Sequence, residues 1–173
     1  MTETTHAEKL FFNKAGLDKS RVQAIVDDAL SGADDGELFL EYRQSESFSW
    51  DDGRLKAASF DTSQGFGLRV VSDESTGYAH ASQLSEEALK RAASSAVAVC
   101  AGHTGIKAEA PVDTNQWLYV EDNPLANIDF ETKVKLLSDI DAYLRDKDGR
   151  VRQVSCSLSS SWQVVQIVRQ DGI

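Results

Sequence analysis

The stretch that most constrains the fold runs from Gly36 to Ser82, where apolar and polar residues alternate at the two-residue period of a β-strand. Turn residues interrupt the alternation at Asp51-Asp52-Gly53, at 61–64 and at 73–76. Because short turns join sequential strands in antiparallel order, we expect four strands in a β-meander here. The segment contains no complete nucleophile, metal or phosphate motif, so its expected contribution is architectural.

Three helices are expected outside the meander, because apolar residues recur there at helical spacing. They run from Lys19 to about Leu30, from Ser85 to about Cys100 and from Asp129 to about Arg145. Asp18 and Ser85 are suited to cap the first two helices at their N-termini. The third helix is predicted to bury one set of apolar residues: Phe130, Val134, Leu137, Ile140, Ala142 and Leu144.

The C-terminal part contains two strand-like runs, 150–159 and 162–170, followed by the hairpin signal Asp171-Gly172. A turn signal at the last positions favours a truncated chain, with a naturally frayed edge as the alternative. Residues 106–125, which include Trp117 and Tyr119, show no period and are expected to form a long connection. We therefore predict a single α+β domain over residues 1–173. Its antiparallel sheet, a β-meander plus C-terminal hairpin strands, is covered by about three helices.

Charge and hydropathy exclude two kinds of partner. The 173 residues carry 18 Lys and Arg against 28 Asp and Glu, a net charge of −10 that would repel nucleic acid. No segment has the roughly 20 apolar residues that a membrane span needs. The N-terminus lacks the pattern of a secretory signal, so a cytoplasmic location is expected.

Few residues are candidates for a functional site. Gly65-Phe66-Gly67 lacks the third glycine and the following helix of a dinucleotide loop, so these glycines are interpreted as room for a neighbouring backbone. His6, His80 and His103 do not have the spacing of metal ligands. Phe66, Tyr78 and His80 are weak candidates for lining a cleft, and a structural role for His80 is the alternative. We predict no catalytic, cofactor-binding or metal-binding residue in this chain.

Four sequence blocks, in this order and spacing, resemble the N-terminal domain of the TldD/PmbA family. They are Glu41-Tyr42-Arg43, Asp51-Asp52-Gly53, Asp61-Thr62-Ser63-Gln64-Gly65-Phe66-Gly67-Leu68-Arg69 and Thr76-Gly77-Tyr78-Ala79-His80. The third and fourth blocks are similar to the TldD branch. The resemblance implies a zinc metallopeptidase, also known as a modulator of DNA gyrase, that works with a PmbA/TldE-type subunit on peptides and unfolded segments.

In that family an HExxxH helix in the C-terminal half binds the zinc, and this sequence contains no HExxxH. The resemblance therefore implies a scaffold and subunit-contact domain that is inactive by itself, with the catalytic domain absent from this chain. Zinc is implied only for the full-length parent. The expected partners are a PmbA/TldE-type subunit or a second copy, and peptide substrates through the parent. The alternative is a stand-alone ligand-binding or protein-binding α+β module without catalysis.

Overall fold

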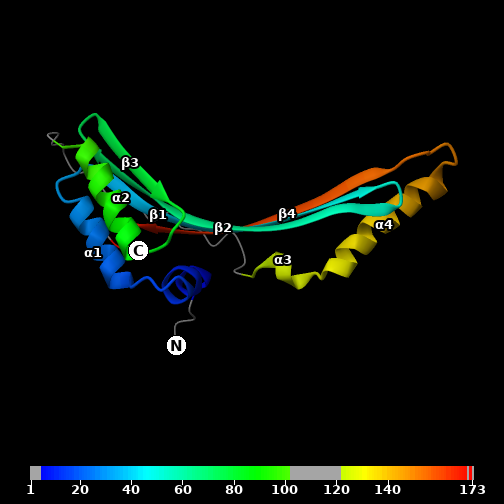
Figure 1. Cartoon of the computed structure of the whole chain (residues 1–173), viewed down its shortest axis with the longest axis horizontal. Helices are drawn as coiled ribbons and strands as arrows, with labels where there is room; N and C mark the ends of the chain where they lie inside the picture. The colour runs from blue at the N-terminus through cyan, green and yellow to red at the C-terminus, as the bar shows by residue number, and fades with distance from the viewer. Residues whose placement is uncertain (1–4, 102–121, 171, 173) are drawn as a thin grey trace. The chain divides into compact units, whose positions relative to one another are not determined.

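The protein is described by a computed structural model that covers residues 5–101, 122–170 and 172. Within these residues four strands form one antiparallel sheet in the order β3-β2-β1-β4 (Figure 1). The strands are β1 (Asp35–Asp51), β2 (Arg54–Ser72), β3 (Ser75–Ala81) and β4 (Ser155–Val168). The helices are η1 (Glu8–Lys14), α1 (Lys19–Ala29), α2 (Glu86–Val99), α3 (Pro124–Asn127) and α4 (Phe130–Lys147). The predicted α+β class is confirmed.

The three predicted helices begin at capped positions, and Asp18 and Ser85 are the caps that the sequence indicated. In each case the capping side chain accepts a hydrogen bond from the backbone N–H three residues further on. The donor–acceptor distance is 2.9 Å at Asp18, 3.3 Å at Ser85 and 2.6 Å at Asp129. These bonds satisfy backbone donors that have no partner in the first turn of a helix. Local sequence is sufficient to set these starts.

The predicted turn at 61–64 is wrong, because β2 continues through it from Arg54 to Ser72. Two expected strands are therefore one. Side chains from Lys56 to Gln64 are exposed, which explains why this part of the strand is polar. A polar run is compatible with either a turn or a solvent-exposed strand, and composition alone does not separate the two.

The predicted hairpin between 150–159 and 162–170 is also wrong, because one strand, β4, spans Ser155 to Val168. Beyond β4, Arg169 and Gly172 form an isolated antiparallel bridge. The Arg169 N–H donates to the Gly172 carbonyl at 2.9 Å, and the Gly172 N–H donates back at 3.2 Å. This pairing agrees with the hairpin signal at Asp171-Gly172.

The chain is divided into two compact units. Unit 1 comprises residues 1–42, 63–121 and 164–173, and unit 2 comprises residues 43–62 and 122–163. In unit 1, α2 packs on β3 and α1 packs on α2. In unit 2, Phe48, Trp50 and Leu137 form a small buried cluster. The single domain predicted over residues 1–173 stays a prediction.

The apolar face predicted for α4 is largely wrong. Of the six residues expected inside, only Leu137 is buried, and Val134 is half-buried. The helix instead buries Lys133 and Asp141, which bind Glu46 and Trp50 of the strand β1. Polar contacts orient α4 on the sheet, so they decide which side of the helix faces inward. Four of the predicted residues remain exposed: Phe130, Ile140, Ala142 and Leu144.

Part of the predicted connection 106–125 lies outside the described residues, as do His103, Trp117 and Tyr119. Its last residues begin the short helix α3, which Asn123 caps through a hydrogen bond from the Leu125 N–H at 3.0 Å. None of the helices in residues 5–101 and 122–170 is long and apolar enough to span a membrane.

Candidate functional site

The three residues predicted to line a cleft lie around one hollow in unit 1. This hollow, about 320 Å³ in volume, lies where β2 pairs with β3 and includes Phe66, Tyr78 and His80 in its lining. The Tyr78 and His80 rings lie 5.7 Å apart between centroids. Tyr78 is exposed, whereas Phe66 is buried. Their role in binding stays a prediction.

The glycines of Gly65-Phe66-Gly67 leave room for strand β3. A Cβ atom at Gly65 would lie 2.8 Å from the Ala81 carbonyl oxygen, and one at Gly67 would lie 3.0 Å from the Tyr78 ring. Both distances are too short for ordinary contacts, so a side chain at either position would displace β3 or the ring. These glycines lie within strand β2, which continues to Ser72, so no helix follows them directly. The interpretation of the glycines as room for a neighbouring backbone is confirmed at Gly65, whereas at Gly67 the neighbour is the Tyr78 side chain.

The described residues do not fit a metal centre. In residues 5–101, 122–170 and 172, no group of three or more His, Cys, Asp and Glu side chains is placed to hold an ion. His80 lies on β3 beside Tyr78, and His6 precedes η1. We therefore derive no metal-dependent step from these residues.

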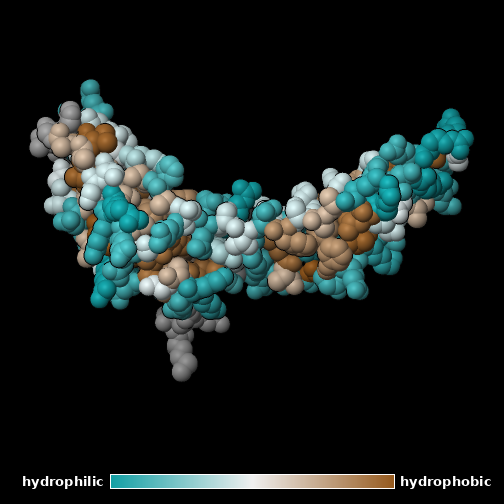
Figure 2. Space-filling model, viewed as in Figure 1, coloured by the Kyte–Doolittle hydropathy of each residue, from teal (hydrophilic) through white to brown (hydrophobic). Residues whose placement is uncertain are grey.

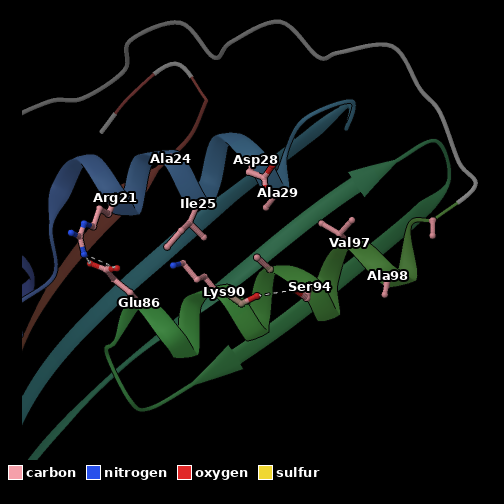
Figure 3. A pocket seen from close by; sticks show the side chains of 12 residues that line it. Arg21, Ala24, Ile25, Asp28, Ala29, Glu86, Lys90, Ser94, Val97 and Ala98 are labelled. Atoms are coloured by element: carbon pink, nitrogen blue, oxygen red, sulfur yellow. Dashed lines mark hydrogen bonds and ion pairs between the residues drawn. The ribbon is translucent and has the colours of Figure 1, made fainter.

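A larger hollow lies between α1 and α2, with a volume of about 1030 Å³ (Figure 3). Small and apolar side chains form most of its lining, including Ile25 and Val97. At one end Arg21 of α1 forms an ion pair with Glu86 of α2 at 3.3 Å. The sequence did not indicate this hollow, because it forms only when two helices distant in the chain are placed side by side.

Four charged side chains connect the strands of unit 1. The Arg69 guanidinium donates to Glu37 at 2.7 Å and to Asp35 at 2.8 Å. Arg169 donates to the other Asp35 oxygen at 2.7 Å. Burial raises the pKa of Asp35, but the Gly36 N–H and the two guanidinium groups outweigh it and hold that pKa below its ordinary value. The cluster joins β1, β2 and the end of β4, and its charges are mutually neutralised.

A third hollow, of about 340 Å³, lies in unit 2. Strands β1 and β2 contribute to it from one side and the segment from Asn123 to Lys133 from the other. Three phenylalanine rings meet there: Phe48 lies 5.6 Å from both Phe60 and Phe130 between ring centroids. The sequence did not predict this site. Finding it requires knowing that β2 is unbroken and that Phe60 is exposed on it.

Comparison with known proteins gives the family. The family model described as PmbA/TldA metallopeptidase domain 1 matches residues 36–100, and the model described as PmbA/TldA metallopeptidase central domain matches residues 123–173. A metalloprotease TldD homolog of Haemophilus influenzae is 35% identical over 142 residues, covering 80% of this chain and 30% of that protein. The homolog of Buchnera aphidicola subsp. Schizaphis graminum is 31% identical over 140 residues, 80% of this chain and 29% of that protein.

Two solved structures share the fold. A modulator of DNA gyrase from Bacteroides thetaiotaomicron aligns with a TM-score of 0.64 at 17% identity, over 90% of this chain and 37% of that one. TldE from Thermococcus kodakarensis aligns with a TM-score of 0.60 at 14% identity, over 85% of this chain and 34% of that one.

The fold and the two matched segments define a metallopeptidase-type domain. The chain belongs to the PmbA/TldD family. It spans 29% to 30% of the length of the curated TldD relatives.

Proposed function

We propose that this chain is the N-terminal scaffold and subunit-contact part of a TldD-type zinc metallopeptidase that degrades or processes peptides and unfolded segments. In this proposal the zinc and the catalytic domain lie in a part of the parent enzyme other than this chain. The chain by itself hydrolyses no peptide. Its function is to shape the space around the catalytic domain and to contact another subunit.

The observation that carries the proposal is an exposed apolar stripe on α4. Its members are Leu136, Ile140, Tyr143 and Leu144. Their separations of 4, 7 and 8 residues place them on one side of the helix. Leu136 is 50% exposed and Tyr143 is 60% exposed, whereas the charged Lys133 and Asp141 of the same helix are buried. A contiguous apolar surface of this kind is typical of a protein contact.

The partner we propose is a PmbA/TldE-type subunit, with self-association as the other form of contact. TldE from Thermococcus kodakarensis shares the fold of this chain, which supports a partner of that type. Peptide substrates would bind at the catalytic domain of the parent enzyme and not at a site in this chain. The cytoplasmic location stays a prediction from the sequence.

Sedimentation velocity tests the contact directly. The chain is mixed with a PmbA/TldE-type protein encoded in the same genome, and we expect a faster-sedimenting complex. Tyr143→Asp places a charge on the stripe and should weaken association by about tenfold or more. Ala142→Asp places the same charge on the adjacent exposed position, off the stripe, and should leave association unchanged. Equal effects of the two variants would contradict the contact through α4.

Two observations test the remaining parts of the proposal. Zinc-dependent peptide hydrolysis by the purified chain would show that it is not an inactive scaffold. The open reading frame beyond the Ile173 codon gives the second test: a downstream HExxxH supports the peptidase parent, and an immediate native stop codon supports the alternative. That alternative is a stand-alone binding module, and the hollow beside Tyr78 and His80 is the observation that favours it.

A further inference from the structure

Among the residues that the structure describes, the first part of β2 has an open edge. Strand β3 pairs with β2 only from Phe66 to Ser72, and β1 lies on the other side of β2. Within the described residues, the part of β2 from Arg54 to Gly65 therefore has one neighbouring strand. Backbone N–H and C=O groups along such an edge are available to pair with another extended chain. In unit 2 this edge covers residues 54–62.

The open edge has charged residues near its turn and an apolar residue further along. Lys56 forms an ion pair with Asp51 at 3.4 Å, close to the β1–β2 turn. From Ala57 to Phe60 no residue is charged. Charged side chains discourage strand addition at a sheet edge, and 57–60, like 62–65 beyond Asp61, has none.

A hollow with two phenylalanines in its lining, Phe60 and Phe130, lies on one face of this edge. Phe60 is 61% exposed, and its ring packs against Phe48 of β1 at 5.6 Å between centroids. Phe130 and Ile128 border the same hollow and are also exposed. Figure 2 shows hydrophobic surface gathered over α3 and the start of α4. Because side chains of neighbouring strands align on each face of a sheet, an added strand would place alternate side chains beside Phe60.

The charge around the hollow is negative. Asp61 lines the hollow and Glu131 follows Phe130, and neither forms an ion pair or a side-chain hydrogen bond with the described part of the chain. The cation in the lining, Lys133, is buried and bound by Glu46 at 2.8 Å and by the Leu125 carbonyl at 3.0 Å. Its charge is therefore neutralised within the protein. A segment that carries Lys or Arg complements this rim.

We propose that the β2 edge at residues 57–62 binds an extended polypeptide segment by strand addition. One apolar side chain of the segment packs in the hollow beside Phe60, and a flanking Lys or Arg lies near Asp61. A hollow of about 340 Å³ is at the lower limit for ligand pockets, which suits one or two side chains better than a cofactor. The site is distinct from the α4 stripe, so either contact can fail without the other.

The test uses the 173-residue chain and a short fluorescein-labelled peptide in which a central Phe is flanked by Val and Lys. In a fluorescence anisotropy titration we expect saturable binding with a Kd on the order of 0.1 mM. Phe60→Ser should weaken it about tenfold. Val99→Ser, a change at an apolar residue of α2 that is exposed to 59%, should change it by less than about twofold.

Three controls separate strand addition from other binding modes. A peptide of the same sequence with backbone N-methyl groups cannot donate the edge hydrogen bonds and should not bind, and this control needs no protein variant. Replacing Lys by Glu in the peptide should weaken binding, and Asp61→Lys should reverse that preference. Hydrogen exchange should slow at residues 57–62 in the complex.

Several outcomes would overturn the proposal. These are equal binding of the N-methylated peptide, equal binding by Phe60→Ser, or protection confined to α4. A scrambled peptide of the same composition that binds equally well would indicate attraction to the −10 net charge alone. A chain that dimerises through Phe60 and ignores the peptide would show that a second copy is the occupant.

Discussion

At Gly77 the absence of a Cβ atom decides how closely helix α2 approaches strand β3. A Cβ atom there would overlap the Ala96 carbonyl oxygen of α2. Both partners are backbone, so neither can move aside as a flexible side chain does. The Thr76-Gly77-Tyr78 part of the sequence, which resembled a family signature, therefore has a packing role in unit 1.

This contact gives a prediction for the residue scale. Gly77→Ala should lower the free energy of unfolding by about 1–3 kcal/mol, because α2 must move away from β3. Gly149→Ala is the control, since nothing lies within 4 Å of a Cβ atom at that position. Urea denaturation followed by circular dichroism measures both. If Gly149→Ala lowered the free energy of unfolding as much as Gly77→Ala, the steric explanation would be ruled out.

Asp141 is a buried carboxylate that joins α4 to the β1–β2 turn. It accepts hydrogen bonds from the Trp50 indole N–H at 2.9 Å and from the Gly53 N–H at 2.7 Å, and it pairs with Arg145. The bond from Trp50, followed by the bond from Arg145, holds the pKa of Asp141 below its ordinary value of 3.8. The charged form is therefore the form that stabilises the fold.

The lowered pKa predicts how stability changes with pH. At pH values above the ordinary 3.8 of the unfolded chain, Asp141 contributes its full stabilisation, and the contribution disappears as the pH falls through the folded-state pKa. Asp141→Asn should lower the Tm by several degrees at neutral pH, and the difference from the unmodified chain should shrink below about pH 4. Thermal melts from pH 7 to pH 3 give the comparison. A difference that stays constant with pH would show that the charge has no part in it.

At the scale of elements, the orientation of α4 buries one of two leucines that are adjacent in the sequence and exposes the other. Leu137 is buried with Phe48 and Trp50, whereas Leu136 is exposed. Leu137→Ala should lower the free energy of unfolding by about 2–4 kcal/mol, because it leaves a cavity in a small core. Leu136→Ala should change it by less than about 0.5 kcal/mol. Chemical denaturation of both variants measures the difference, and similar losses would contradict the orientation of α4.

Elements were predictable where the signal is local. The caps at Asp18 and Ser85 and the alternation of β1 depend on neighbouring residues, and the structure agrees with them. The continuity of β2 through 61–64 and of β4 through Ser159 was not predictable. An exposed polar strand and a turn have similar compositions, and pairing with a distant strand decides between them.

At the scale of the whole molecule, the two compact units raise the question of cooperativity. Leu137 lies in unit 2 and Leu89 lies in unit 1, and both are buried. If the units unfold separately, Leu137→Ala should speed hydrogen exchange in unit 2 and leave the slowest amides of unit 1 unchanged, and Leu89→Ala should do the reverse. Exchange followed by mass spectrometry tests both variants. Equal acceleration in the two units would support the single domain predicted from the sequence.

The candidate sites were predictable only in part, and the reason differs from site to site. Phe66, Tyr78 and His80 were grouped from their strands, and the register that places Gly67 opposite His80 brings them to one hollow. The hollow beside Phe60 needed two segments that are distant in the chain. Hydropathy predicted that α4 would bury its apolar residues and expose its charged ones, but Lys133 is buried and the apolar stripe is exposed. The ion pair with Glu46 offsets the cost of burying the Lys133 charge.

The sequence by itself determined the class of fold and the starts of the helices, because caps, turn residues and hydrophobic periods depend on a few neighbouring residues. It also determined the family, because the ordered motifs are read directly from the sequence. Only the tertiary structure decided which side of α4 faces the sheet, where β2 continues and which part of its edge has no neighbouring strand among the described residues. These features depend on contacts between residues far apart in the chain. We chose Tyr143 and Phe60 for the proposed contacts because their side chains are still exposed after those distant contacts have formed.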